Sequence, residues 1–294
     1  MKHAHDSVLI GVDGGGTGCR VRIADTAFTT IAQSKGGPSN VTTDRRAAIG
    51  NIADAIAEAA TTAGLSHDAI ADARIHLGLA GVMSRDIADD VAQALPYPNI
   101  IVTDDRPTNL VGALGGQDGF LIAAGTGSFI AAQREGQSRF VGGWGYHLSD
   151  QASAAWLGRH LLEQVLLCQD GLAQHSDLTR SALARFQDDP NAIVAFSGSA
   201  KPVDFGALAP LVVDAMTAGD PMGQRLMQDG LAYLRLGLDR LGFQPGDRLC
   251  LTGGVGAQYA TLFPQEVQIG LIAPAGNALD GAIRLAATQL GGRP

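Results

Sequence analysis

Hydrophobic positions change their spacing several times along the chain, and each spacing predicts a different element. Val8–Val12 and Val21–Ala24 are short apolar runs joined by a glycine-rich turn, which is typical of a β-hairpin. Over residues 44–63, alanine and isoleucine recur every three or four positions, and this spacing predicts a helix. The same criteria predict strands at 29–33, 74–79, 99–103, 120–124, 128–133, 248–252 and 267–271, and helices at 84–94, 151–168, 177–187, 205–218, 221–241 and 277–290.

The order of these elements indicates two α/β lobes. A hairpin, a helix, a strand, a helix and a strand occupy the first part of the chain. A second glycine hairpin opens at Gly119, and long helices follow it. Because the chain has 294 residues, we expect two lobes of roughly 100 to 200 residues, each large enough for its own core.

Composition narrows the class of protein. Hydrophobic residues make up 46% of the chain and charged residues 17%, which excludes a disordered chain. The net charge of −8, with no basic cluster beyond Arg45-Arg46, argues against a nucleic-acid partner. Cys19, Cys168 and Cys250 are dispersed, no apolar run has membrane-spanning length, and the polar start of the chain has no apolar signal region. These features favour a cytoplasmic protein.

The first glycine-rich turn has the composition of a phosphate-binding loop. Asp13-Gly14-Gly15-Gly16-Thr17 lies between two predicted strands, so it is neither a Walker loop nor a dinucleotide fingerprint. Three glycines let the backbone bend around a phosphate and direct amide groups at it, Thr17 adds a hydroxyl, and Asp13 can hold hydrated Mg²⁺. An ordinary glycine hairpin is the alternative.

A second turn of the same kind begins the second lobe. Gly125-Thr126-Gly127-Ser128 separates the predicted strands 120–124 and 128–133. Two such loops facing each other would clamp the phosphates of a nucleotide, and a transferring phosphoryl group needs this positioning more than it needs covalent chemistry from the protein. A plain turn is the alternative here as well.

One carboxylate is placed to act as a base. Asp104 follows the predicted strand 99–103, at the carboxyl edge where open α/β sheets bind ligands. It could accept the proton of an attacking hydroxyl. Asp105 is the competitor, since the alternative role for one of the pair is to cap the helix that begins near Pro107.

A third glycine-rich segment follows a late strand. In Leu251–Ala257, the strand breaks into glycines, and bare backbone at Gly253 and Gly254 could pack against a flat adenine face next to Ala257. A turn is the simpler interpretation of glycine after a strand.

These segments together resemble the actin, sugar kinase and Hsp70 superfamily, with phosphate 1 at Asp13–Thr17, phosphate 2 at Gly125–Ser128, an adenosine motif at Leu251–Ala257 and a second connecting helix at Asn277–Ala287. The chain is most similar to the N-acetylglucosamine kinase and bacterial glucosamine kinase branch of the BadF/BadG-type ATPases. The resemblance implies a two-lobed actin-like ATPase fold of the ribonuclease H type with the active site in the cleft between lobes. It places residues 1–115 with about 277–294 in one lobe and 116–276 in the other.

The resemblance also implies roles for individual residues. Asp104 matches the catalytic base of the family, and Asn40 matches its sugar-binding asparagine. Five further positions match residues around the sugar: Thr126, Gly127, Trp144, Gly145 and Asp150. Asn and Asp supply donors and acceptors for hydroxyl groups, while glycine N–H and Trp border an acetamido group or a ring face. Apart from the family, Trp144 would be assigned to the core and Asp150 to a helix N-cap.

Two departures from the family concern the sugar. Where the family commonly has Gly-Asp-Glu-Gly-Ser, this chain has Ser149-Asp150-Gln151-Ala152-Ser153, which replaces a carboxylate by an amide and removes a glycine. Ala80 stands where N-acetylglucosamine kinases can present a serine. Both changes leave the identity of the sugar open.

The expected reaction is transfer of the γ-phosphoryl group of ATP, held with Mg²⁺, to the 6-hydroxyl of an amino sugar. The expected partners are ATP and the sugar, in a homodimer that binds neither nucleic acid nor membrane. A reductase-activating ATPase with an iron–sulfur cluster is one rival, which the dispersed cysteines disfavour. A sugar-sensing regulator is another, which would need a DNA-reading module, and no basic helix-turn-helix precedes Val8.

Overall fold

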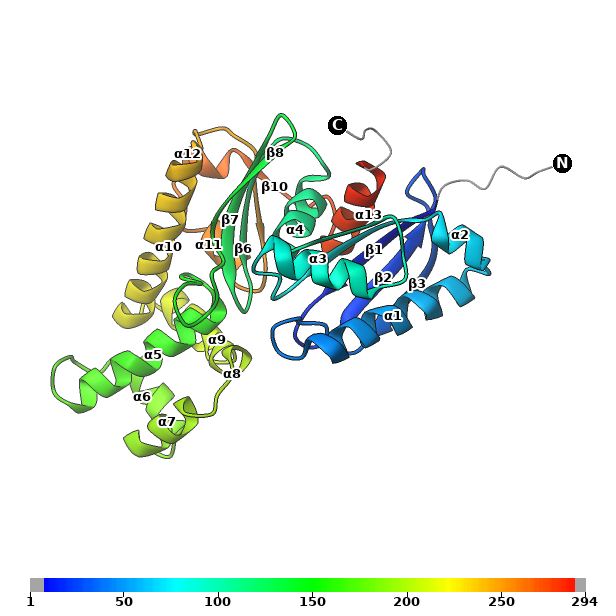
Figure 1. Cartoon of the computed structure of the whole chain (residues 1–294). Helices are drawn as coiled ribbons and strands as arrows, with labels where there is room; N and C mark the ends of the chain where they lie inside the picture. Colours follow the sequence, from blue (N-terminus) through cyan, green and yellow to red (C-terminus); the bar gives the residue numbers. More distant parts are fainter. Residues whose placement is uncertain (1–7, 289–294) are drawn as a thin grey trace. The chain divides into compact units, whose positions relative to one another are not determined.

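The computed structural model describes residues 8–288, and the chain divides into two compact units (Figure 1). Unit 1 comprises residues 1–117 and 274–294, and unit 2 comprises residues 118–273. The chain leaves unit 1 once, builds unit 2 from one continuous segment and then returns to unit 1. The polar start Met1–Ser7, on which the expectation about a signal region depends, lies outside the described residues.

The sheet of unit 1 has five strands in the order β3-β2-β1-β4-β5. Neighbours β3, β2 and β1 are antiparallel, whereas β1, β4 and β5 are parallel. Parallel strands end at one edge of a sheet, so the residues that follow β1, β4 and β5 come together there. The strands are β1 (Leu9–Gly14), β2 (Cys19–Ala24), β3 (Thr30–Gly36), β4 (Arg74–Leu79) and β5 (Ile100–Thr103).

Helices cover both faces of this sheet. The buried side chains of α1 and α3 join the core on one face, together with Ile10 and Leu77 of the strands. Helices α4 and α13 pack against β1 and β4 on the other face and against each other. Gly281 permits this close approach, because a β-carbon there would lie 1.9 Å from the Thr108 carbonyl oxygen. The helices are α1 (Arg45–Thr62), α2 (His67–Ala71), α3 (Arg85–Ala94), α4 (Asp105–Leu114) and α13 (Ala278–Thr288).

The sheet of unit 2 repeats this topology. Its order is β10-β9-β6-β7-β8, with β6, β7 and β8 antiparallel and β6, β9 and β10 parallel. The glycine-rich turns of both units therefore occupy equivalent positions, each joining the central strand to its antiparallel neighbour. The strands are β6 (Gly119–Ala124), β7 (Ser128–Arg134), β8 (Gln137–Gly142), β9 (Leu249–Thr252) and β10 (Leu271–Ile272).

Unit 2 is richer in helices than unit 1, and its core lies among α5, α6, α9, α10 and the strands. Among residues 8–288, no helix is both long enough and apolar enough to cross a membrane. The helices are α5 (Ala154–Gln169), α6 (Asp177–Ala184), α7 (Pro190–Ser197), α8 (Pro202–Gly206), α9 (Ala209–Thr217), α10 (Pro221–Leu241), α11 (Gly256–Ala260) and α12 (Gln265–Gln268).

Two predicted elements of unit 2 are wrong. The helix expected at 205–218 is two helices, α8 and α9, because Pro210 lies in the first turn of α9 and lacks the N–H that a continuous helix needs. The strand expected at 267–271 begins instead as α12, with Pro264 at its N-cap, and only Leu271–Ile272 pair with β9. Strand β8 and helices α7 and α11 of unit 2 were not predicted, and neither was α2 of unit 1.

Candidate functional site

Backbone hydrogen bonds fix the loop after β1, and its central glycine has open space beside it. The Gly15 amide donates to the Gly18 carbonyl at 2.9 Å, and the Ser39 amide donates to the Gly15 carbonyl at 2.9 Å. Gly15 and Gly16 have no positive φ, and a β-carbon on Gly16 would meet no atom within 4 Å. Neither the backbone conformation nor the packing of this unit requires the lack of a side chain at these two positions, and the open space leaves room for a ligand.

Asp13 lies at the end of β1 beside this loop, directly opposite Arg20 of β2. Its carboxylate accepts a hydrogen bond from Arg20 Nε at 3.2 Å, and the two side chains form an ion pair. One carboxylate in this position fits Mg²⁺ that arrives with a nucleotide, because such Mg²⁺ keeps several waters and uses one or two protein oxygens. Thr17 is exposed in the same loop, where its hydroxyl is accessible.

Asp104 begins α4 at the end of β5. Its carboxylate accepts hydrogen bonds from the Arg106 amide at 2.9 Å and from Arg106 Nε and Nη2 at 2.9 and 3.1 Å. Asp104, and not its neighbour Asp105, is thus the N-cap of the helix. The guanidinium fork fixes the orientation of the carboxylate, which retains access to solvent.

Asp105 has a different environment. Burial, together with the neighbouring Asp104 carboxylate, raises the pKa of Asp105 to about 6, and Asp13 adds to the shift. A carboxyl group with a pKa near neutrality can act in acid–base chemistry. Both aspartates therefore stay candidates for the base, with Asp104 oriented by Arg106 and Asp105 perturbed by burial.

A buried histidine supports the backbone at Asp104. His76 Nε2 lies 3.1 Å from Thr103 Oγ1, and that hydroxyl donates to the Asp104 carbonyl at 2.8 Å. Since the hydroxyl has one proton, it accepts from His76, which places a proton on Nε2. Burial lowers the pKa of His76 to about 4, so the ring is neutral at pH 7. Sequence reasoning missed His76 because a histidine within an apolar strand has no sequence signature of its own.

Asn40 is held by a local turn near the ends of β1 and β4. Its Oδ1 accepts from the Thr42 amide at 3.0 Å and from Thr42 Oγ1 at 2.6 Å. The Val41 amide donates to the Ala80 carbonyl, and the Ala80 amide donates to the Gly14 carbonyl at 2.8 Å, which joins this turn to the phosphate 1 loop. The Asn40 amide NH₂ forms no hydrogen bond within the described part of the chain, so it is available to a ligand.

The second glycine loop is braced by the start of α5. The Ala154 amide donates to the Gly125 carbonyl at 2.8 Å, and the Ala155 amide donates to the Thr126 carbonyl at 3.3 Å. A β-carbon on Gly125 would meet nothing within 4 Å. Ser128 differs from its neighbours, because its hydroxyl donates to the Gln151 carbonyl at 2.5 Å and so already has a structural partner.

Asp150 lies against this loop. It is buried, and its backbone is left-handed with φ of 64°. A β-carbon on Gly127 would come within 2.7 Å of Asp150 Oδ2, so the two residues are in direct contact. Burial raises the pKa of Asp150, with the amides of Gly145 and Ser128 opposing the shift. The N-cap of α5 is Ser153, so the N-cap role that the residue pattern suggests for Asp150 is wrong. Left-handed backbone is uncommon for residues other than glycine, and aspartate is one of the few side chains that tolerate it.

The altered family segment carries a second strained position. Ala152 has φ of 68° and is fully buried. Glycine, which the resemblance to the family puts at this position, adopts such a conformation without steric penalty, whereas alanine rarely does. The chain thus holds an alanine in left-handed backbone two residues after Asp150.

The loop that contains Trp144 is exposed. Trp144 has 67% of its surface accessible, so the core assignment that residue pattern alone suggests is wrong. Gly145 has φ of 95°, and its carbonyl accepts from the Leu148 and Ser149 amides at 3.2 and 2.8 Å. These bonds close the turn that leads to Asp150.

The predicted adenosine segment joins the second phosphate loop. Gly253 has φ of 88°, and a β-carbon there would lie 2.3 Å from the Ala124 carbonyl oxygen. The Val255 amide donates to this carbonyl at 3.0 Å. Gly254 has open space beside it, and Ala257 lies in α11. Gly253 is thus explained by backbone conformation and packing, whereas Gly254 is free to border a ligand.

Within each unit, the predicted residues gather at one edge of the sheet. Unit 1 brings together Asp13 and its loop, Asn40 and Asp104, and unit 2 brings together Gly125–Ser128, Asp150 and Gly253. Arg20 and Arg106, which hold two of the aspartates, were not predicted. The only sequence signal for Arg106 is its place two residues after a helix cap.

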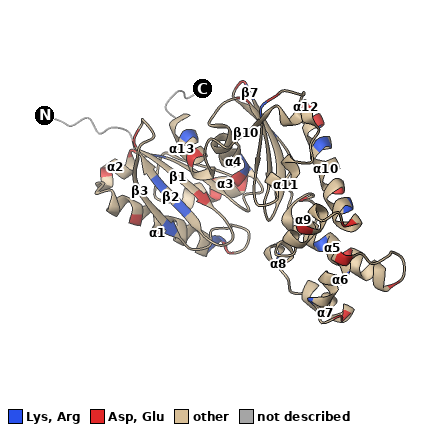
Figure 2. Cartoon of the chain, turned by 180° about the vertical axis from the view of Figure 1, so that it is seen from behind, with Lys and Arg blue, Asp and Glu red and all other residues tan. Residues whose placement is uncertain are grey.

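Charged side chains outside these sheet edges do not gather in one place. Figure 2 shows acidic and basic positions interspersed along α10.

Within residues 8–288, no group of three or more His, Cys, Asp or Glu side chains is arranged to hold a metal ion. Cys19, Cys168 and Cys250 are each buried with a free thiol, on β2, α5 and β9. The cysteines provide no shared cluster site.

The fold is that of the actin-like sugar kinases. The chain superposes on a ROK family glucokinase from Streptomyces griseus with a TM-score of 0.57 at 16% identity, covering 96% of this chain and 99% of that one. A protein from Chromobacterium violaceum, proposed to be an N-acetylglucosamine kinase, gives a TM-score of 0.84 at 34% identity, covering 96% and 99%. The predicted α/β fold class is confirmed.

Residues 10–268 match the BadF/BadG/BcrA/BcrD ATPase family, and the chain belongs to that family. It is 32% identical over 278 residues to glucosamine kinase GspK of Vibrio cholerae, covering 94% of this chain and 95% of the relative. The resemblance stated from the sequence motifs is therefore confirmed.

Proposed function

We propose that the chain is an ATP-dependent amino-sugar kinase, which transfers the γ-phosphoryl group of ATP to the 6-hydroxyl of glucosamine or N-acetylglucosamine. The observation that carries this proposal is the 32% identity to a glucosamine kinase across nearly the whole length of both proteins. The local geometry agrees with it, because both glycine loops leave open space where phosphates would approach.

We assign the following roles to the side chains of unit 1. Asp104 accepts the proton of the sugar hydroxyl, Arg106 orients it, and the Asn40 amide donates to another hydroxyl of the sugar. Asp13 holds Mg²⁺ bound to the nucleotide, and the amides of Gly14–Gly16 with the Thr17 hydroxyl bind phosphate oxygens. When bound, Mg²⁺ neutralises charge that develops on the transferring group.

Unit 2 supplies the remaining roles. Gly125, Thr126 and Gly127 bind phosphate through backbone amides, and Gly254 with Ala257 borders the adenosine. Asp150 accepts hydrogen bonds from sugar hydroxyls, and Trp144 lies along the substituent at the second carbon of the sugar. We assign Ser128 a structural role, since its hydroxyl holds Gln151.

The test is ADP release from ATP and Mg²⁺ with glucosamine, N-acetylglucosamine or glucose, and with no sugar. We expect an amino sugar to raise turnover well above the no-sugar rate, and the phosphorylated product to carry its phosphate on the 6-hydroxyl by NMR. Equal turnover with and without sugar would reject the kinase and support the reductase-activating ATPase. We further propose a cytoplasmic homodimer, which light scattering coupled to gel filtration would test.

A further inference from the structure

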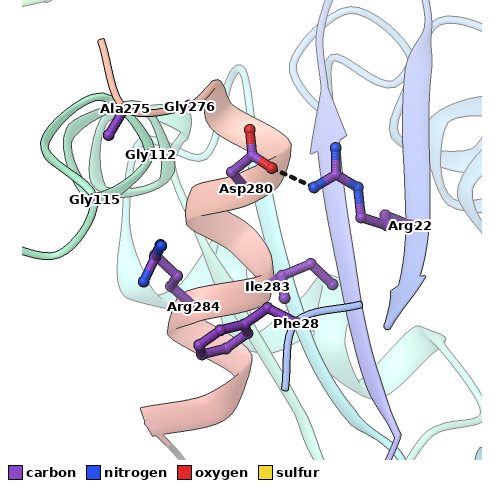
Figure 3. A pocket seen from close by; sticks show the side chains of 9 residues that line it. All are labelled: Arg22, Phe28, Gly112, Gly115, Ala275, Gly276, Asp280, Ile283 and Arg284. Carbon is purple, nitrogen blue, oxygen red and sulfur yellow. Dashed lines mark hydrogen bonds and ion pairs between the residues drawn. The ribbon is translucent and has the colours of Figure 1, made fainter. Parts of the chain in front are cut away.

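A small cavity of about 90 Å³ lies in unit 1, and no residue of the predicted phosphate loops lines it (Figure 3). Its volume corresponds to about three waters at roughly 30 Å³ each, which suits one small polar group and not a whole nucleotide. The wall combines β2, the turn after it, the C-terminal end of α4, the segment before α13 and the first two turns of α13. It is lined by Arg22, Phe28, Gly112, Gly115, Ala275, Gly276, Asp280, Ile283 and Arg284.

The single carboxylate in the cavity is already fully engaged. Asp280 Oδ1 forms an ion pair with Arg22 Nη1, and Oδ2 accepts from the Asn277 amide at 2.7 Å. Burial opposes ionisation of Asp280, but the Asn277 amide and the Arg22 guanidinium outweigh it and lower the pKa. Asp280 therefore stays ionised and balances Arg22.

The second guanidinium has no hydrogen-bonded partner of this kind, and it acts on Asp280 only through its charge, which helps to lower the pKa of that carboxyl group. Arg284 lies over the Phe28 ring, with 5.2 Å from Cζ to the ring centroid, and forms no hydrogen bond or ion pair within residues 8–288. The contact with the ring uses the face of the guanidinium, so its N–H groups stay available at the edge. Arg22 Nε is also buried and has no hydrogen-bond partner among the described residues.

The donors thus exceed the acceptors. Two arginines and one aspartate give the cavity side chains a net positive charge, and the side-chain groups without a hydrogen bond are N–H donors. A planar guanidinium matches the oxygens of phosphate in a two-point contact. We propose that this cavity binds a small phosphate oxyanion, either inorganic phosphate or the phosphate group of a monoester, through Arg284 and Arg22.

The position of the cavity gives such a ligand a possible effect. The chain passes from one unit to the other after residues 117 and 273, and Gly115 and Ala275 of the lining lie within two residues of these points. The Ala275 amide donates to the Ala113 carbonyl at 2.9 Å, which joins the two connecting segments. A bound phosphate would contact both of them.

The experiment is calorimetric titration with inorganic phosphate at constant ionic strength, on protein saturated with Mg²⁺ and a nonhydrolysable ATP analogue. The analogue removes binding at the proposed nucleotide site. We expect phosphate still to bind, Arg284→Met to weaken it at least tenfold, and Arg85→Met, which changes an exposed arginine of the same unit, to leave it unchanged. No binding to wild type at millimolar phosphate, loss of binding with the analogue, or wild-type affinity in Arg284→Met would overturn the proposal.

Two further arms complete the test. If circular dichroism shows that Arg284→Met does not fold, Arg284→Lys replaces it as the test variant, since lysine keeps the charge but loses the two-point contact. A phosphate affinity reduced at least threefold in Arg284→Lys supports the site, and an unchanged affinity overturns it. Titration with methyl phosphate, a monoester without a sugar that the proposed active site could bind, separates the sources. Tighter binding of a monoester supports a phosphate ester as the ligand, and tighter binding of inorganic phosphate supports the free ion.

Discussion

The Asp150 carboxylate and Gly127 are in such close contact that any side chain at residue 127 would displace the carboxylate. A substitution at Gly127 therefore alters two proposed functions together, phosphate binding by the loop and sugar binding by Asp150. Variants of Gly125 and Asp150 separate these functions, because Gly125 has open space beside it.

The glycine loops can be tested without disturbing the fold. Gly16→Ala and Gly125→Ala should leave the melting temperature within about 2 °C of wild type, since no atom lies within 4 Å of the new β-carbon. Both should weaken ATP binding at least tenfold in calorimetry, because the methyl group occupies the space of a phosphate. Gly50→Ala, on the surface of α1 with equally open surroundings, is the matched control and should bind ATP normally. Unchanged ATP affinity in both loop variants would contradict the clamp.

The identity of the base can be settled by two isosteric changes. Asp104→Asn should lower kcat about 10²-fold or more while ATP binding survives, and the fold should persist because asparagine is also a good N-cap. Asp105→Asn should retain most of the turnover. The reverse result, full activity in Asp104→Asn with loss in Asp105→Asn, would transfer the role to Asp105.

Asp105 should also make stability depend on pH. Its pKa is about 6 in the folded chain against 3.8 for the free group, so the folded state binds more protons between these values. Asp105 therefore destabilises the fold as pH rises through about 4 to 6. Asp105→Asn should gain roughly 1 to 3 kcal/mol at pH 8 and nothing at pH 4 in urea unfolding. The same gain at both pH values, or a gain in the surface control Asp54→Asn, would contradict the burial of this charge.

The polar contacts to the sugar can be removed one at a time. Asp150→Asn removes the carboxylate but keeps a residue that tolerates left-handed backbone. Asn40→Asp keeps the oxygen that accepts the hydrogen bond from Thr42 but replaces the NH₂ group. Each should raise KM for the sugar about 5-fold to 150-fold, the equivalent of roughly 1 to 3 kcal/mol for an unpaired buried group. KM for ATP should change much less. A sugar KM equal to that of wild type in either variant removes that residue from the sugar site.

Trp144 should affect the choice of sugar and not the fold. Its exposed ring contributes little to the core, so Trp144→Ala should melt near the wild-type temperature. If the ring borders the second carbon of the sugar, kcat/KM should fall more for N-acetylglucosamine than for glucosamine or glucose, because the acetamido group gains most from apolar contact. Equal losses for all three sugars would exclude that role.

The bounds of elements that depend on local sequence pattern were predicted correctly. Strand 74–79 matches β4 residue for residue, and helix 221–241 matches α10, which has Asp220 as N-cap and Gly242 at its end. The pattern failed where an element was short or interrupted, as at Pro210 and at Leu271–Ile272. The two residues of β10 form a strand because they pair with β9. Local sequence does not reveal such a tertiary partner, so this strand could not be predicted from it.

Side-chain partners in the site were the least predictable part. The motifs located Asp104 and Asp150, but the Arg106 fork, the His76 contact and the left-handed backbone of Asp150 depend on neighbours that only the fold supplies. Asp104 and Asp105 are the clearest case, since Arg106 pairs with the first carboxylate, whereas burial and the neighbouring carboxylates perturb the second.

The return of the chain to unit 1 has a consequence for its synthesis. Helix α13 packs on β1, although more than 260 residues of chain separate them. Leu9 and Ala24, which are fully buried against Ile283 and Ala286, therefore stay exposed to the surroundings of the nascent chain until synthesis has passed residue 286. All residues of unit 2 are synthesised before α13, so unit 2 can fold first. During that time the apolar face of unit 1 remains exposed, where chaperones can bind it and where it can aggregate.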